Sequence, residues 1–216
     1  MIILGLTGSI GMGKSTAAAT LRRLGIPLFD ADRLVHRLLA PGGSAVEPVA
    51  AAFPGVRRGE GGIDRALLGQ RVFSDREALF RLERIIHPMV EASEKRFLAG
   101  ARARREPIVV LDIPLLFESG SERRCDYVLV VSAPGLVQRQ RVLRRPGMTE
   151  RRMGAILANQ MPDREKRRRA DFVVPTGLSR NLSLRRLRAI VRYLRDGRSR
   201  VARRGRCAFR EPRRRS

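Results

Sequence analysis

The sequence contains few cysteines, few aromatic residues and no tryptophan. Only two cysteines occur among 216 residues, Cys125 and Cys207, and neither forms a CxxC pair or lies beside a cluster of histidines. Disulfide frameworks and cysteine–histidine zinc sites need several such residues at short spacings. We therefore expect neither, and we interpret both cysteines as ordinary thiols.

Long hydrophobic runs are also absent. No apolar stretch approaches the roughly 18 residues that a membrane-spanning helix needs. The run Ile2-Ile3-Leu4 is too short for a signal peptide and has no basic leader. With 43% hydrophobic and 31% charged residues, the composition is typical of a soluble globular chain. These features predict a cytoplasmic protein with no membrane partner.

Acidic residues are scarce beside basic ones. The chain has 45 Lys and Arg against 21 Asp and Glu, which gives a formal net charge of +24. Such a charge suggests a polyanionic partner such as nucleic acid. However, the basic residues are spread along the chain, and aromatic residues that could stack on bases make up only 5%. We expect no obligatory nucleic acid, and a nucleic-acid-binding ATPase is kept as the alternative from another functional class.

Short apolar runs alternate with helical patterns. Several of these runs are rich in β-branched residues, as in strands that helices cover on both faces. The expected strands are 2–6, 26–29, 108–112, 127–131 and 172–174. Strands separated by helices predict an α/β fold with a parallel sheet.

Two longer helical regions interrupt this pattern. Residues 33–105 form a helical insertion that could bind the acceptor substrate, with Ser74 and Glu77 as a capping box inside it. Residues 138–169 are helical and basic, with breaks at two prolines, and are interpreted as a mobile lid. The predicted core then comprises 1–32, 106–137 and 170–195, followed by a basic, disordered tail over 196–216.

The strongest motif lies after the first strand. Gly8-Ser9-Ile10-Gly11-Met12-Gly13-Lys14-Ser15 matches G-x-x-x-x-G-K-[ST] in full, between a strand and a helix. This P-loop turns backbone N–H groups toward phosphates at a helix N-terminus. Lys14 would reach the β- and γ-phosphates of ATP, and the Ser15 hydroxyl would bind Mg²⁺.

Two carboxylates follow predicted strands. Asp32 comes just after the second strand, where it could orient or deprotonate an attacking hydroxyl or could cap the next helix. Asp112 ends another strand and is a weaker candidate for holding Mg²⁺ through water. No N-K-x-D element is present, which disfavours a GTPase.

Further motifs support a resemblance to a known family. After the P-loop come Asp30-Ala31-Asp32, His87-Pro88, Pro114-Leu115-Leu116-Phe117-Glu118, Gln160-Met161-Pro162 and Ala170-Asp171-Phe172-Val173. In order and approximate spacing, residues 1–195 resemble the dephospho-CoA kinase family. The resemblance is weaker after Val174, where Pro175-Thr176-Gly177 replaces an Asn-containing turn and puts the local adenine contacts in doubt. The nearest alternative is another nucleoside or nucleotide kinase.

The resemblance implies a P-loop NTPase three-layer sandwich with a helical CoA-binding insertion and a helical lid. It implies ATP-dependent phosphorylation of the ribose 3′-hydroxyl of dephospho-CoA, the last step of CoA synthesis, with Mg²⁺. The ATP-binding residues would be Gly11, Met12, Gly13, Lys14, Ser15 and Thr16. Asp32 would be the base and contact the substrate, and Arg141, in a Gln-x-x-Arg element with Gln138, would stabilise the transferring phosphoryl group. For His87, substrate contact and a structural hydrogen bond are both kept.

Overall fold

The computed structural model describes residues 1–59, 61–73 and 75–196. The chain divides into two compact units. The first consists of Met1–Phe29 together with the chain from Arg104 onward, and the second of Asp30–Ala103. The predicted tail after residue 196 lies outside the described residues, as do Cys207 and the predicted cap Ser74.

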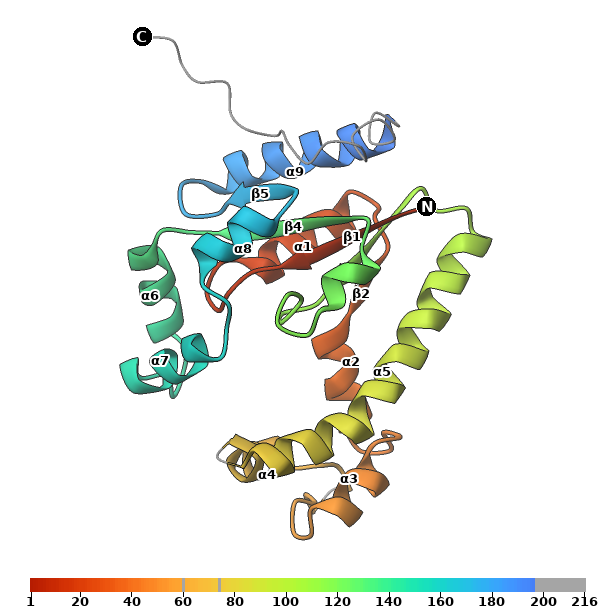
Figure 1. The fold of residues 1–216 in the computed structure, drawn as a ribbon, viewed down its shortest axis with the longest axis vertical. Coiled ribbons are helices and arrows are strands. Elements are labelled where there is room, and N and C mark those ends of the chain that lie inside the picture. Colours follow the sequence, from red (N-terminus) through yellow and green to blue (C-terminus); the bar gives the residue numbers. More distant parts are fainter. Residues whose placement is uncertain (60, 74, 197–216) are drawn as a thin grey trace. The chain divides into compact units, whose positions relative to one another are not determined.

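A five-stranded sheet forms the centre of the first unit (Figure 1). Its strands are β1 (Ile2–Thr7), β2 (Leu28–Asp30), β3 (Ile108–Asp112), β4 (Tyr127–Ser132) and β5 (Phe172–Pro175). They lie in the order β2-β3-β1-β4-β5. β1 pairs in parallel with both β3 and β4, and β4 pairs in parallel with β5. The predicted α/β fold with a parallel sheet is confirmed.

Helices cover both faces of this sheet. On one face, α1 (Lys14–Arg23) and α9 (Arg180–Arg195) pack on apolar strand residues such as Leu4, Val110 and Leu129. On the other face, α8 (Asp163–Arg169) contacts β4, and a second apolar cluster contains Leu116, Phe117, Val128 and Val130. The remaining helices of this unit are α6 (Gly135–Leu143), η1 (Ser121–Arg124) and α7 (Glu150–Ala158). Alternate residues of β4 thus enter two different cores, as the period of a strand requires.

The last strand is fixed at its start by Asp171. Its Oδ2 accepts a hydrogen bond from the Val128 N–H at 2.8 Å. Burial raises the pKa of the Asp171 carboxyl, and backbone hydrogen bonds from Val128 and Asp171 oppose this shift. The contact joins the beginning of β5 to β4, next to the parallel register that starts at Phe172.

The second unit is helical. It contains α2 (Ala31–Leu38), α3 (Val46–Ala52), α4 (Arg65–Phe73) and α5 (Arg76–Ala103), and α5 packs against the other three. The first turn of α5 is capped by Asp75, whose Oδ1 accepts hydrogen bonds from the N–H groups of Glu77 and Ala78. Pro88 lies inside α5, so the helix continues through the His87-Pro88 motif. A proline removes one helix hydrogen bond, and here the packing of α5 along the unit maintains the helix across that position.

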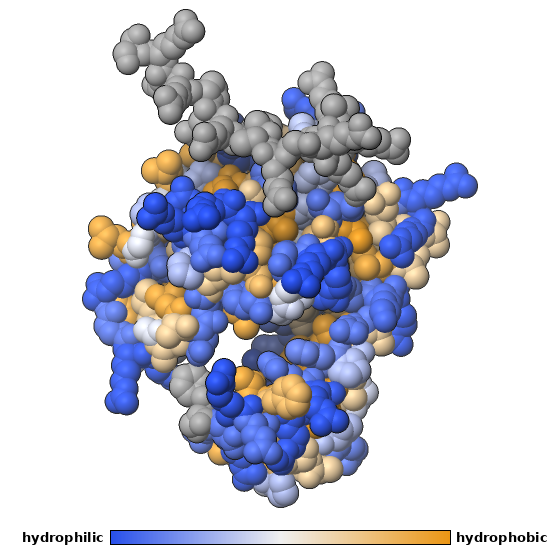
Figure 2. All heavy atoms as spheres, in the orientation of Figure 1, coloured by the Kyte–Doolittle hydropathy of each residue, from blue (hydrophilic) through white to orange (hydrophobic). Residues whose placement is uncertain are grey.

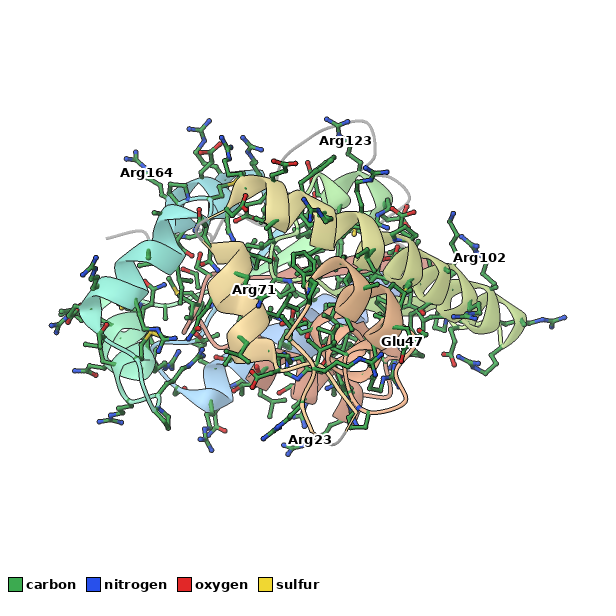
Figure 3. The ribbon with its side chains drawn as sticks, turned by 90° about the horizontal axis from the view of Figure 1, so that it is seen from below. Arg23, Glu47, Arg71, Arg102, Arg123 and Arg164 are labelled. Atoms are coloured by element: carbon green, nitrogen blue, oxygen red, sulfur yellow. The ribbon has the colours of Figure 1, made fainter. Side chains whose placement is uncertain are left out.

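Hydrophilic side chains cover most of the face shown in Figure 2. Exposed arginines such as Arg123 on η1 and Arg164 on α8 point away from the ribbon (Figure 3). Within residues 1–196, apart from the two undescribed positions, no helix is both long enough and apolar enough to cross a membrane.

Candidate active site

The P-loop connects β1 to α1 and has a tightly constrained backbone. Gly11 and Gly13 adopt φ angles of 76° and 90°, in the left-handed region that favours glycine. A side chain at Gly11 would place its Cβ 2.6 Å from Cγ2 of Val142, and one at Gly13 would place it 3.0 Å from Oγ1 of Thr176. The glycines therefore provide the backbone conformation and also allow close packing of the loop on its neighbours.

Lys14, the first residue of α1, is paired with Asp112 at the end of β3. The distance from Nζ to Oδ1 is 2.9 Å, and the two side chains are 17% and 4% exposed. Asp112 was a weaker sequence candidate, and the structure brings it directly to the P-loop lysine. The lysine ammonium carries three donors, so it can bond more than one oxygen at a time. The ion pair holds the cation at the carboxyl edge of the sheet.

The first turn of α1 presents further groups for an anion. Lys14, Ser15 and Thr16 begin the helix, where the helix dipole is positive, and the Thr16 N–H donates to the Gly13 carbonyl at 3.1 Å. The side chains of Ser15 and Thr16 are exposed. These residues place two hydroxyl groups and the positive end of the helix at the location that the P-loop motif predicts.

Three side chains from α6 and from the turn after β5 contact the P-loop. Gln138 Nε2 donates to the Ile10 carbonyl at 2.8 Å, and Thr176 Oγ1 donates to the Met12 carbonyl at 2.6 Å. Arg141 is half-buried, and its guanidinium contacts the carbonyl oxygens of Gly11 and Thr176 and the Thr176 hydroxyl at distances of 3.4, 2.6 and 3.2 Å. The structure thus places the positive charge of Arg141 directly beside the loop.

Motifs that are far apart in the sequence meet near the C-terminal end of the predicted lid. Glu118 Oε1 accepts the Met161 N–H at 2.7 Å and lies 2.9 Å from Nζ of the fully buried Lys166. This Lys166–Glu118 contact is an ion pair by distance, although the Nζ geometry is not that of a hydrogen bond. Gln160 Oε1 accepts the Ile10 N–H at 3.1 Å. The Pro114–Glu118 and Gln160–Pro162 motifs are therefore joined to each other and to the P-loop.

The two predicted acceptor-side residues, Asp32 and His87, both belong to the second unit. Asp32 is exposed in the first turn of α2, and the N-cap of that helix is Asp30, whose Oδ1 accepts the Arg33 N–H at 2.9 Å. The capping interpretation of Asp32 is therefore wrong, because the helix begins at Ala31, two residues earlier than that interpretation required. His87 is exposed on α5.

Comparison with known proteins identifies the family. The dephospho-CoA kinase family model matches residues 2–179. The chain is 62% identical to a dephospho-CoA kinase of Paramagnetospirillum magneticum over 198 residues, 92% of this chain and 93% of the relative. It is 54% identical to one from Rhizobium meliloti, over 91% of this chain and all of the relative.

Solved structures agree with this result. A crystal structure of a Thermus thermophilus protein matches with a TM-score of 0.77 and 40% identity, covering 89% of this chain and 97% of that one. The dephospho-CoA kinase from Campylobacter jejuni matches with a TM-score of 0.67 and 26% identity, over 91% and 98% of the two chains. The chain belongs to the dephospho-CoA kinase family. This membership confirms the resemblance and makes the protein a kinase that acts on dephospho-CoA in CoA biosynthesis, with ATP as co-substrate.

Two contacts with the P-loop of this dephospho-CoA kinase were not predicted from the sequence. The contact of Thr176 with the P-loop was missed, because Thr176 was noted only as part of an unusual turn. Gln138 was recognised as a motif residue without a role of its own, and the structure shows that it reaches a loop 128 positions earlier in the chain. Neither contact has a local sequence signal, since both depend on the parallel sheet bringing these segments together.

Proposed function

We propose that the chain transfers the γ-phosphoryl group of ATP to the ribose 3′-hydroxyl of dephospho-CoA, giving CoA and ADP, and that the residues discussed below carry this reaction. The observation that supports the proposal most directly is the complete P-loop, with Lys14 paired to Asp112, in a chain of the dephospho-CoA kinase family.

On the nucleotide side, Gly11 to Thr16 bind the ATP phosphates. The loop and the first turn of α1 offer N–H groups to the phosphates, and Lys14 neutralises charge on the β- and γ-phosphates. Arg141 places a second positive charge beside the loop, which supports its proposed role in stabilising the transferring group. Its guanidinium already contacts backbone and hydroxyl oxygens, so its influence is mainly electrostatic.

The residues near Lys14 fit Mg²⁺. This ion prefers oxygen ligands and is usually held by one or two protein groups together with substrate phosphates and water. The Ser15 hydroxyl and the Asp112 carboxylate offer that chemistry, and no cluster of three or more His, Cys, Asp or Glu ligands occurs in the described part of the chain. We propose that Ser15 binds the ion and that Asp112 assists. When bound, Mg²⁺ would neutralise charge on the phosphate oxygens.

On the acceptor side, Asp32 orients the 3′-hydroxyl and accepts its proton. As the hydroxyl oxygen forms a bond to the γ-phosphorus, the bond from that phosphorus to the β–γ bridging oxygen breaks, and ADP carries away the electron pair. The carboxylate of Asp32 is exposed and lies two residues beyond β2, which supports this role. His87 contacts dephospho-CoA through its exposed ring. We further propose that the reaction takes place in the cytoplasm and needs no nucleic acid.

A coupled assay of ADP release tests the function. ATP and Mg²⁺ are supplied with dephospho-CoA, with a panel of nucleoside monophosphates, or with a polynucleotide, and CoA is identified by mass spectrometry. We expect strong stimulation by dephospho-CoA alone, with CoA as the product. Stimulation by a nucleoside monophosphate without any by dephospho-CoA would contradict the acceptor assignment. Stimulation by the polynucleotide at moderate salt would instead favour the nucleic-acid-binding ATPase.

A further inference from the structure

Three successive carbonyl groups of the P-loop are each hydrogen-bonded by a side chain from outside the loop. The pairs are Gln138 Nε2 to Ile10 O at 2.8 Å, Arg141 Nη1 to Gly11 O at 3.4 Å and Thr176 Oγ1 to Met12 O at 2.6 Å. The two short contacts come from neutral side chains on different elements, α6 and the turn after β5. The back of the loop is therefore fixed at two separate peptide groups.

Fixing a carbonyl also fixes the N–H group that follows it. In a planar trans peptide, the C=O of one residue and the N–H of the next point in opposite directions. The bond from Gln138 to the Ile10 carbonyl therefore directs the Gly11 N–H away from Gln138. In the same way, the bond from Thr176 to the Met12 carbonyl directs the Gly13 N–H away from Thr176. These two amides then face the opposite side of the loop, where a nest of N–H groups binds an anion.

The direction of the Thr176 hydroxyl is determined by its surroundings. Arg141, which can only donate, approaches Thr176 Oγ1 at 3.2 Å, so this oxygen accepts there. Its single proton is then available for the Met12 carbonyl, the nearest acceptor at 2.6 Å, while the Ser132 carbonyl lies 3.4 Å away. The hydroxyl thus has a defined role at the loop that a residue without a donor could not perform.

Gln138 is similarly constrained. Only 8% of its surface is exposed, although glutamine is usually found at the surface. Its backbone carbonyl and its Cγ also lie against Gly11, where an added Cβ would come within 3.1 and 3.4 Å of them. Gln138 therefore contacts the loop at both Ile10 and Gly11.

We propose that Gln138 and Thr176 are positioning residues that orient the Ile10–Gly11 and Met12–Gly13 peptides of the P-loop for the phosphates of ATP. They act through the loop backbone and leave contact with the nucleotide to the amides of Gly11 and Gly13. The proposal rests on the proposed use of ATP at this loop. Preoriented donors need no reorganisation when the charged ligand arrives, which strengthens their interaction with it.

The test uses substitutions that remove each donor while preserving shape. Thr176→Val replaces the hydroxyl by a methyl group, and Thr176→Ser keeps the hydroxyl. Gln138→Leu removes the amide, and Gln140→Leu makes the same change at an exposed position of α6. For each variant, the affinity for a non-hydrolysable ATP analogue with Mg²⁺ is measured by calorimetry in the absence of acceptor. The kcat, both KM values and the melting temperature of the ligand-free chain are measured as well.

We expect Thr176→Val and Gln138→Leu each to weaken analogue binding by about five- to tenfold, the effect of about one hydrogen bond. Their kcat should fall as well, and the KM for dephospho-CoA should stay within about twofold of the parent value. Thr176→Ser and Gln140→Leu should bind the analogue like the parent chain. Because the two residues act on one loop, the double variant should lose less than the product of the single losses.

Parent-like binding by both Thr176→Val and Gln138→Leu would overturn the proposal. It would also fail if Thr176→Ser were as weak as Thr176→Val, or if binding losses simply followed losses of melting temperature, with Gln140→Leu included. The outcome is separable from the proposed function, because analogue binding is measured without an acceptor. If dephospho-CoA were not phosphorylated while these variants still lost affinity, the positioning role would stand and the acceptor assignment would fall.

Discussion

The nucleotide side and the acceptor side of this kinase are constructed differently. The P-loop lysine is paired with a buried carboxylate, and three successive loop carbonyls are bonded by side chains from two other segments. The acceptor-side candidates, Asp32 and His87, are instead exposed on helices of the second unit. Groups fixed by many contacts suit a ligand with a constant shape, such as a triphosphate. Exposed groups can adjust to an acceptor when it binds.

Asp32→Asn should cause the largest loss of kcat, and this loss should separate the acceptor side from the nucleotide side. Asparagine keeps the size of the side chain but cannot accept the hydroxyl proton, and a general base contributes about 10²- to 10⁴-fold to rate. We expect kcat to fall by about 10³-fold, while the affinity for the ATP analogue stays within about twofold. Steady-state kinetics and calorimetry on the same preparation measure both quantities.

Asp30→Asn is the matched control for this prediction. Asp30 caps α2, and asparagine caps helices about as well as aspartate, so the helix should be preserved. We expect its kcat to remain within a few-fold of the parent value. Equal losses in the two variants would point to the charge of the segment rather than to a base at Asp32, and full turnover by Asp32→Asn would remove the base assignment.

Arg141→Met should cause the next largest loss of kcat. This substitution acts on the nucleotide side, beside the P-loop. Removing one preorganised charged donor near a transferring phosphoryl group lowers kcat by about 10²-fold, and we expect ATP affinity to fall as well. Arg141→Lys keeps the charge without the planar fork, so it should retain more activity than the Met variant. If Lys and Met were equally poor in kcat, the contacts of the guanidinium with Thr176 and Gly11 would matter more than its charge.

Much of the fold and of the nucleotide site was predictable from the sequence. The P-loop has fixed residue types at fixed spacings because its backbone conformation and its ligand both demand them, as the positive φ angles of Gly11 and Gly13 show. The strands β3 and β4 were recognised because both faces are covered, which makes their sequences continuously apolar. Local chemistry determined these features, so local patterns revealed them.

Other features depend on contacts between distant segments. The helix α5 continues through Pro88 although proline is a local breaking signal, because packing along α5 outweighs the loss of one hydrogen bond. The choice of Asp30 over Asp32 as the N-cap depends on where α2 begins, and the helix starts directly after β2, two residues before the predicted helical region. The link from Thr176 to Met12 spans 164 positions and has no local signal.

The smallest effect is expected for His87→Gln, which tests whether the exposed acceptor side contributes to binding. Losing one hydrogen bond to a bound substrate costs about 0.5 to 1.5 kcal/mol, so the KM for dephospho-CoA should rise by about threefold to tenfold. The kcat and the KM for ATP should not change, because His87 lies in the second unit and outside the P-loop. His36→Gln is the control, since His36 is the other exposed histidine and its Nδ1 lies 2.9 Å from Nη1 of Arg65. An unchanged KM with a lowered melting temperature for His87→Gln would favour the structural hydrogen bond, and the acceptor side would then rely on Asp32 alone among the predicted residues.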